Sequence, residues 1–321
     1  MKNLLKNPLM VVLLAGSCGL LWGTAFPAIK VSYPALNIGP TDSYLQLLFA
    51  GYRFFLAGLL ILITARLTGQ SLRPGGRGWL GPLFLVALFQ TTLQYATFYI
   101  GLSYTSGVKA SILCGTSTFF AVTIAHYIFR GDRMNWQKLF GLTIGFGGMV
   151  LVNLGKGGLT LDFAFWGEGM IILSSLFAAI GAVLVKGLGQ RINVVVLTGY
   201  QMVMGALMLL LLAVTWVSPL ALHFNATSGW IFIWLVTLSA LAFSIWNALM
   251  KHNSVGKVSV FNFLVPVFGT IASAVLLPGE TVTGGVMVSL ILVSLGIMVV
   301  NLDKTRDDLS GGGKVDQVVG E

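Results

Sequence analysis

Charged residues are scarce in this sequence: Lys, Arg, Asp and Glu together make up only 9% of its 321 residues. A soluble globular domain carries about 25% charged residues, so this shortage excludes an ordinary soluble fold. Hydrophobic residues reach 56% of the chain, and long apolar stretches follow one another with short polar links between them. We therefore expect the chain to fold in a membrane.

Cysteine and histidine are sparse as well, with two and three copies. Cys18 and Cys114 fall in different apolar stretches, so we expect no disulfide framework. The sequence contains none of the His, Cys and carboxylate spacings that are typical of metal sites, and no nucleophile motif of a hydrolase. We therefore expect no metal, no cofactor and no enzymatic activity. A membrane-embedded transferase is the alternative among enzymes.

The cations outnumber the acidic residues by nineteen to ten, but they form no basic face. They are dispersed over the short links, which is typical of topology signals and not of a nucleic-acid-binding surface. With the amino terminus in the cytoplasm, fifteen of the nineteen fall in cytoplasmic segments. We therefore expect a multi-pass protein of the cell (plasma or inner) membrane with both termini in the cytoplasm. The lipid bilayer is then its surroundings, and nucleic acid is not a partner.

Ten apolar stretches are predicted to cross the bilayer, each near the ~20 residues that a helical crossing requires. They are continuously apolar, which favours helices over the alternating strands of a barrel. The predicted spans cover residues 9–29, 44–65, 79–102, 110–129, 138–155, 169–187, 194–216, 230–250, 258–277 and 285–302.

Short motifs of the first half recur in the second half at a constant offset of 148 residues. The recurring motifs are Gly51-Tyr52 with Gly199-Tyr200, Ser106-x-x-Lys109-x-Ser111 with Ser254-x-x-Lys257-x-Ser259, and Val152-Asn153-Leu154 with Val300-Asn301-Leu302. Because each half holds an odd number of spans, the second half must lie inverted in the membrane. The loop charges agree, since the link 130–138 holds three cations and the equivalent link 278–286 holds none.

The duplication predicts three parts of the chain. Residues 1–156 form a first repeat of five spans and residues 157–304 form a second. Residues 305–321 are polar and glycine-rich, so we expect them to form a disordered cytoplasmic tail.

Trp22-Gly23-x-x-Phe26 in the first span, Pro266 in the ninth and Gly279-Glu280 after it accompany the duplicated halves. With these motifs the chain resembles the EamA-type members of the drug/metabolite transporter superfamily over nearly its whole length except the tail. Thr118 and Asp132 depart from the family's proline and glutamate. The resemblance implies an alternating-access carrier of small metabolites, often an exporter of amino acids or related compounds, with a central cavity between the halves.

We therefore predict an all-α integral membrane protein of ten transmembrane helices, arranged as two inverted five-helix repeats of the EamA type. Its expected activity is secondary transport of a small polar or amphipathic metabolite, an amino acid or related compound, out of the cell. No Asp or Glu falls in the interior of a predicted span and only His126 is suited to relay protons, which favours facilitated transport or exchange. The sequence does not fix the oligomeric state, and a homodimer is one alternative.

Arg53 falls near the middle of the second span, where an unpaired cation costs at least ~2.5 kcal/mol. It either meets a carboxylate of the substrate or bonds backbone carbonyl groups and stabilises helix packing. The sequence leaves both roles open. The repeat places the neutral Gln201 at the equivalent position of the second half.

The third span is unusually polar, with Gln90 and Gln94 at helical spacing and Tyr95 and Tyr99 beside them. A lipid-facing glutamine is costly, so these residues are expected to face inward and bind substrate. Interhelical hydrogen bonding without a ligand is the alternative. The other predicted substrate-binding residues are Trp22, Ser244, Trp246, Asn247 and Asn262. A cage of Trp22, Tyr95, Tyr99 and Trp246 around a lipid headgroup or a quaternary amine is the alternative for the substrate class.

Pro27 and Pro266 cannot donate hydrogen bonds to the carbonyl groups of Gly23 and Asn262. We expect the helices to bend there, with Gly23, Pro27 and Pro266 acting as hinges. The alternative is a kink whose free carbonyl is satisfied by neighbouring side chains.

Small hydroxyl residues of the fourth and ninth spans, Ser117 and Ser259 among them, are expected to serve close helix packing. Lys30 and Lys186 end the first and sixth spans at opposite faces. Their side chains can reach the lipid headgroups, with a role in a gate as the alternative.

Overall fold

The computed structural model describes residues 4–39, 41–73, 78–105, 110, 113–129, 131–154, 163–276 and 284–302. Throughout these residues the regular structure is helical, without a strand, which confirms the prediction of an all-α chain. Seven helical segments of this described part are long and apolar enough to cross a membrane. The boundary at residue 156, the Gly279-Glu280 motif and the tail 305–321 lie outside the described residues.

The helices of the first half follow a short 3₁₀ turn, η1 (Leu4–Lys6). They are α1 (Pro8–Ala35), α2 (Ser43–Leu67), α3 (Leu80–Ala87), the π-helix η2 (Leu88–Leu93), α4 (Gln94–Tyr104), α6 (Thr116–Ile128) and α7 (Trp136–Leu154). The helices of the second half are the π-helix η3 (Phe165–Gly169), α8 (Met170–Leu188), α9 (Val194–Val214), α10 (Ala226–His252), α11 (Val255–Ser259), the 3₁₀ segment η4 (Val260–Phe263), α12 (Leu264–Leu276) and α13 (Gly284–Asn301). Each predicted span overlaps one of these helices or a run of consecutive ones.

The first helix is longer than predicted. The sequence places the end of the span at residue 29, whereas α1 continues to Ala35 with Pro27 and Pro34 inside it. Asn7 begins this helix, because its side chain accepts hydrogen bonds from the N–H groups of Leu9 and Met10. Pro27 therefore does not end the helix.

The spacing of Gln90 and Gln94 predicted one regular α-helix for the third span. The structure differs. Between α3 and α4 the backbone forms the π-helix η2, in which hydrogen bonds reach one residue further than in an α-helix. The Thr92 hydroxyl lies within hydrogen-bond distance of the carbonyl oxygens of Ala87 (3.3 Å) and of Gly205 in α9 (3.1 Å). The side chains of Gln90 and Gln94 are thus not related by one regular α-helical turn, as residues four apart in an α-helix would be.

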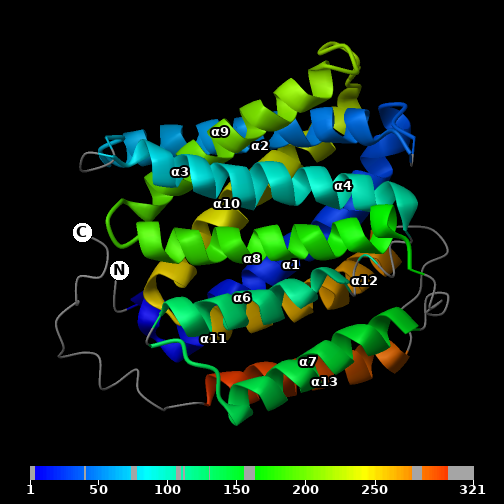
Figure 1. Ribbon diagram of the computed structural model, residues 1–321. Helices are drawn as coiled ribbons and strands as arrows, with labels where there is room; N and C mark the ends of the chain where they lie inside the picture. Colours follow the sequence, from blue (N-terminus) through cyan, green and yellow to red (C-terminus); the bar gives the residue numbers. More distant parts are fainter. Residues whose placement is uncertain are drawn as a thin grey trace.

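Two pairs of equivalent helices pack closely and run in opposite directions. Along α2 and α9, Gly51 faces Leu210 and Gly58 faces Val203. Along α7 and α13 the same trend holds, since Gly141 faces Val300, Gly145 faces Gly296 and Gly148 faces Leu292. In both pairs the residue number of the partner falls as the first helix advances, so the helices are antiparallel. Figure 1 shows these two pairs at opposite edges of the molecule, with α1 and α8 crossing between them.

The equivalent helices α1 and α8 each pack against two helices of the opposite half. α1 packs against α10 and α12, both from the second half, while α8 packs against α4 and α6, both from the first. Moreover, the first residue of α12 lies 148 residues after the first residue of α6, and the same offset separates their last residues. This is also the offset of the sequence motifs. Each half therefore places one helix, α1 or α8, against the opposite half.

Two large clusters of buried side chains fill the interior, one around Phe261 and Phe263 and the other around Phe49 and Phe54. Trp22 contacts both clusters. Lipid is as apolar as these side chains, so their close packing rather than the exclusion of water holds the helices together. The space beside Trp22, between the two clusters, is where the structure leaves a cavity.

Candidate functional site

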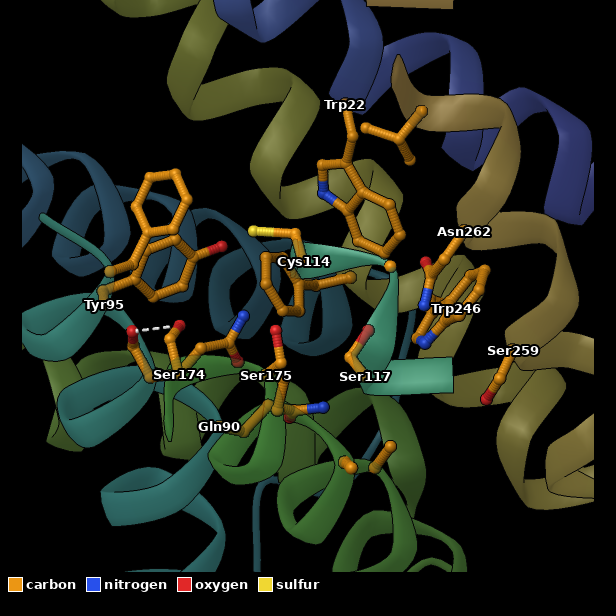
Figure 2. Close-up of a pocket in the computed structure, with 18 of the residues that line it drawn as sticks. Trp22, Gln90, Tyr95, Cys114, Ser117, Ser174, Ser175, Trp246, Ser259 and Asn262 are labelled. Carbon is orange, nitrogen blue, oxygen red and sulfur yellow. Dashed lines mark hydrogen bonds between the residues drawn. The ribbon is translucent and has the colours of Figure 1, made fainter. Parts of the chain in front are cut away.

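A cavity of about 250 Å³ lies between the two halves and is lined by helices of both. Eight of the ten residues predicted to bind substrate line it: Trp22, Arg53, Gln90, Gln94, Tyr95, Tyr99, Trp246 and Asn262. Figure 2 shows Trp22, Ser117, Ser175 and Asn262, from four different helical segments, directed toward one common space. Among the described lining residues Arg53 is the one cation, and none is Asp, Glu or His.

Arg53 is 4% exposed and projects from the middle of α2. Its Nε donates a hydrogen bond to Oγ of Ser239 in α10 (2.8 Å), and the guanidinium lies 5.0 Å from the centre of the Phe54 ring. Within the described residues no carboxylate pairs with it, and its other N–H groups have no hydrogen-bond partner. Arg53 thus joins α2 to α10 through a side-chain hydroxyl, not a backbone carbonyl, while its charge faces the cavity.

Aromatic rings line the cavity together with this charge. The ring of Trp22 lies 5.5 Å from that of Phe243 and 5.1 Å from that of Trp246, edge to face in both cases. Tyr95 and Tyr99 of α4 line the same cavity, and the Tyr95 ring lies 4.4 Å from the ring of Phe54, the neighbour of Arg53 in the chain. One part of the cavity therefore combines a cation with an aromatic wall.

Two polar groups of the wall have no partner within the described part of the chain. The buried indole N–H of Trp22 donates no hydrogen bond, and the side-chain amide of Asn262 makes none either. A buried donor without a partner costs about 1–3 kcal/mol, so the Trp22 N–H is suited to a ligand that supplies the missing hydrogen bond. The half-buried Asn262 amide faces the same cavity and can bond the same ligand.

Serine residues also line the cavity, and sequence reasoning assigned none of these to substrate binding. Ser174 and Ser175 of α8 line it, and their hydroxyls donate to the carbonyl oxygens of Gln94 (2.7 Å) and Leu113 (3.1 Å). Figure 2 marks the first of these bonds. Each hydroxyl oxygen keeps lone pairs that can accept a hydrogen bond. The signal in the sequence is the spacing of Ser174, Ala178 and Ala182, which are small residues on one helical face.

Ser117 and Ser259 also line the cavity, so the expectation that they serve helix packing alone is incomplete. Ser259 does take part in packing, because its carbonyl oxygen accepts a hydrogen bond from the Thr118 hydroxyl (3.0 Å).

The structure does not bring Ser244 and Asn247 to the cavity. Asn247 is fully buried behind the wall, where its amide donates to the Thr198 hydroxyl (3.1 Å) and accepts from the Gln90 amide (3.2 Å). Asn247 therefore makes interhelical hydrogen bonds instead of facing a ligand, which was the alternative. Gln90 does both, because it lines the cavity and also bonds to Asn247.

Gln201, the counterpart of Arg53, is also absent from the cavity wall. It is fully buried in the contact of α9 with η2, where its Oε1 accepts a hydrogen bond from Thr91 (2.8 Å). The charge at Arg53 accordingly has no equivalent on the other side of the cavity.

The three predicted hinge residues have different surroundings. A Cβ atom at Gly23 would lie 2.7 Å from Cβ of Phe268 in α12, so Gly23 is a close-packing position of α1. Pro27 lies inside the continuous α1. Pro266 lines the cavity from the first turn of α12, which follows η4, the 3₁₀ segment that carries Asn262. Irregular backbone beside the cavity is therefore found in η4, just before Pro266, and not at Pro27.

The sequence matches the model of the EamA-like transporter family twice, over residues 9–154 and 165–302. The chain belongs to the EamA-like transporter family. As an EamA protein it is a transporter with several membrane-spanning helices, as the resemblance implied.

Similar proteins carry the same kind of name. The chain is 28% identical to the uncharacterized transporter YvbV of Bacillus subtilis over 94% of both chains. It is 27% identical to a chloroplastic WAT1-related protein of Arabidopsis thaliana, covering 89% of this chain and 68% of the other. A chain in a solved crystal structure superposes with a TM-score of 0.72 at 19% identity, over 91% of this chain and 96% of its own. That likeness concerns the fold alone.

Proposed function

We propose that this EamA protein is a secondary transporter that moves a small carboxylate-bearing metabolite, an amino acid or a related compound, out of the cell by alternating access. The observation that carries the proposal is Arg53, a buried cation at a cavity whose described lining residues include no carboxylate. An uncompensated buried charge is costly. A carboxylate of the substrate would accept hydrogen bonds from the free guanidinium N–H groups.

The cavity wall supports a substrate with a second polar group. Asn262 and the serine hydroxyls of α8 lie on the wall and can accept hydrogen bonds from an amine. The Trp22 indole and the neighbouring rings offer an apolar surface to the body of the substrate. Lipid or quaternary-amine transport fits less well, because Arg53 lines the same cavity as the aromatic rings and its charge repels a cation.

Ten crossings in two inverted repeats are part of this proposal. The antiparallel pairs α2 with α9 and α7 with α13 support it, because equivalent helices run antiparallel when the two halves lie inverted. The matched contacts of α1 and α8 with the opposite halves support it as well. A site between such halves can open to either side when they rock against each other.

The orientation follows from the cations. Lys186, Lys251 and Lys257 lie where α8 and α10 end and α11 begins, and this end we assign to the cytoplasm of the cell membrane. The two termini then lie in the cytoplasm. Facilitated transport or exchange is the coupling we propose, since the described lining residues include no Asp, Glu or His to relay protons.

Thermal-shift screening of the purified protein tests the substrate class, because a ligand that binds only the folded state raises the melting temperature. Amino acids, other carboxylates, amines and nucleobases form the panel. We expect carboxylate-bearing compounds to stabilise the protein and Arg53→Gln to abolish this shift. Arg66→Gln, an exposed position on the same helix, is the matched control and should keep it.

A second variant separates binding from packing. Ser239→Ala removes the hydrogen bond to Arg53 but keeps the charge, so it should lower the melting temperature without abolishing the shift by ligand. Stabilisation by amines alone, or an unchanged ligand shift in Arg53→Gln, would contradict the proposal.

A further inference from the structure

One buried carboxylate outside the cavity joins three separate parts of the chain. Asp132 lies in the link between α6 and α7 and is 2% exposed. Its Oδ2 forms an ion pair with Nζ of Lys186 near the end of α8. Both of its oxygens accept from the N–H of Val255 at the start of α11, at 3.1 and 3.0 Å. A loop of the first half is thereby fastened to two elements of the second half.

Lys186 is held on other sides as well. Its Nζ donates to the carbonyl oxygen of Asn253 (3.0 Å) and lies 4.8 Å from the centre of the Phe129 ring. The Asn253 amide in turn donates to the carbonyl oxygen of Leu5 (2.9 Å). The position of Lys186 in the sequence suggested that its side chain reaches the lipid headgroups. In the structure this side chain is only 16% exposed and instead contacts other residues of the protein.

This contact lies directly beyond one end of the cavity. Lys186 follows the lining residue Ala182 by one helical turn, and Val255 precedes the lining residue Ser259 by one turn. At a rise of 1.5 Å per residue the separation along each helix is about 6 Å. Val183 and Val258, which lie between these residues along α8 and α11, are buried, and so is Leu249 of α10.

We propose that Asp132, Lys186 and the Val255 N–H form a latch that holds the cytoplasmic end of the cavity closed and must separate before the cavity opens there. The proposal rests on the proposed transport function and on its orientation. The residues of the latch come from opposite halves, so a movement that draws the link of Asp132 away from the ends of α8 and α11 breaks the ion pair and the hydrogen bonds to Val255. When the latch opens, water replaces its hydrogen bonds, which gives the element two discrete states.

The latch is testable without a known substrate, because Cys114 lines the cavity and the chain has only two cysteines. In a Cys18→Ala background, a membrane-impermeant maleimide is added to inside-out vesicles and the rate of Cys114 alkylation is measured. Removing one partner of a buried pair strongly disfavours the closed state, so Asp132→Asn should raise the rate at least about tenfold. Lys186→Met should do the same.

The matched control is Asp42→Asn. Asp42 also accepts a backbone hydrogen bond, from Gly39 (2.8 Å), but it lies at the opposite end of the helices, so the rate should stay at that of the parent. Equal rates in Asp132→Asn, Lys186→Met and Asp42→Asn would overturn the latch. An increase confined to right-side-out vesicles would also overturn it.

A reversible cross-link provides the opposite test and remains informative if a latch variant fails to fold. In a Cys18→Ala/Cys114→Ser background, Asp132→Cys/Lys186→Cys should lose counterflow of the stabilising compound when a bifunctional methanethiosulfonate reagent, long enough to span the ion pair, bridges the two thiols, and regain it when a reductant releases the reagent. Thermal shift by that compound should survive cross-linking. Continued counterflow in the cross-linked protein would overturn the latch. Faster Cys114 alkylation in Asp132→Asn, without any stabilising carboxylate, would retain the latch and reject the substrate class.

Discussion

Two asparagines of the second half, Asn247 and Asn262, lie in opposite surroundings. Asn247 is fully buried and its amide bonds to Gln90 and Thr198. Asn262 faces the cavity, and its side chain makes no hydrogen bond within the described residues. The same side chain is therefore structural at one position and available to a ligand at the other.

Substitution by alanine should separate these two roles. Asn247→Ala leaves Gln90 and Thr198 without their shared partner, and we expect it to lower the free energy of unfolding by about 1–3 kcal/mol. Asn262→Ala breaks no hydrogen bond of the described structure, so it should change stability by less than about 0.5 kcal/mol while weakening ligand binding. Melting temperatures with and without ligand measure both effects. Equal loss of stability in the two variants would contradict this assignment.

At the scale of elements, glycine sets how closely the antiparallel pair of α7 and α13 packs. A Cβ atom at Gly148 would lie 2.9 Å from both Cβ of Leu292 and the carbonyl oxygen of Ser289, whereas one at the neighbouring Gly147 would meet nothing within 4 Å. Adjacent glycines of one helix thus have different functions, close contact at Gly148 and none at Gly147.

Gly147→Ala and Gly148→Ala form a matched pair that tests this contact. Alanine favours the helix over glycine by about 1 kcal/mol, so Gly147→Ala should be neutral or stabilising. Gly148→Ala gains the same propensity but pushes α7 from α13, and overpacking costs about 1–3 kcal/mol. Denaturation in mixed detergent measures the difference, and stabilisation by Gly148→Ala would argue against the packing described.

The elements also show what the sequence could and could not predict. Apolar length predicts where helices lie, because a helix in lipid must be about 20 residues long: every predicted span overlaps helical residues, and seven helical segments of the described part are long and apolar enough to cross a membrane. The π-helix η2 has no comparable signal, and its Thr92 hydroxyl contacts Gly205 of the other half, a contact that no local spacing indicates. Likewise, Asn247 and Asn262 are both asparagines in apolar surroundings, and only the packing of distant helices decides which one meets the cavity.

Pairing between a link and a distant helix is hidden from the sequence for the same reason. Lys186 and Asp132 are 54 residues apart and belong to different halves, so no local spacing connects them. Arg53 is the opposite case, because a cation in the middle of an apolar span is conspicuous by itself. Its position at the cavity agrees with that signal, whereas its bond to Ser239 required the structure.

At the scale of the whole molecule, α2 with α9 and α7 with α13 flank two inner helices, α1 and α8, that each pack against the opposite half (Figure 1). In this arrangement the cavity lies where the halves meet, and no single half encloses it. A movement of the halves therefore changes access to the cavity without unfolding either of them.

Two serines provide a matched test of inversion. Ser71 lies in the link after α2 and Ser218 in the equivalent link after α9, and both are exposed. Each hydroxyl oxygen accepts from the N–H two residues further on, at 3.3 Å in both cases, so cysteines there should react with similar intrinsic rates. In a Cys18→Ala/Cys114→Ser background we expect an impermeant maleimide to label Ser71→Cys from the cytoplasmic face and Ser218→Cys from the outer face. Labelling of both from one face would show that the halves lie parallel, and the antiparallel contacts of α2 with α9 would then need another explanation.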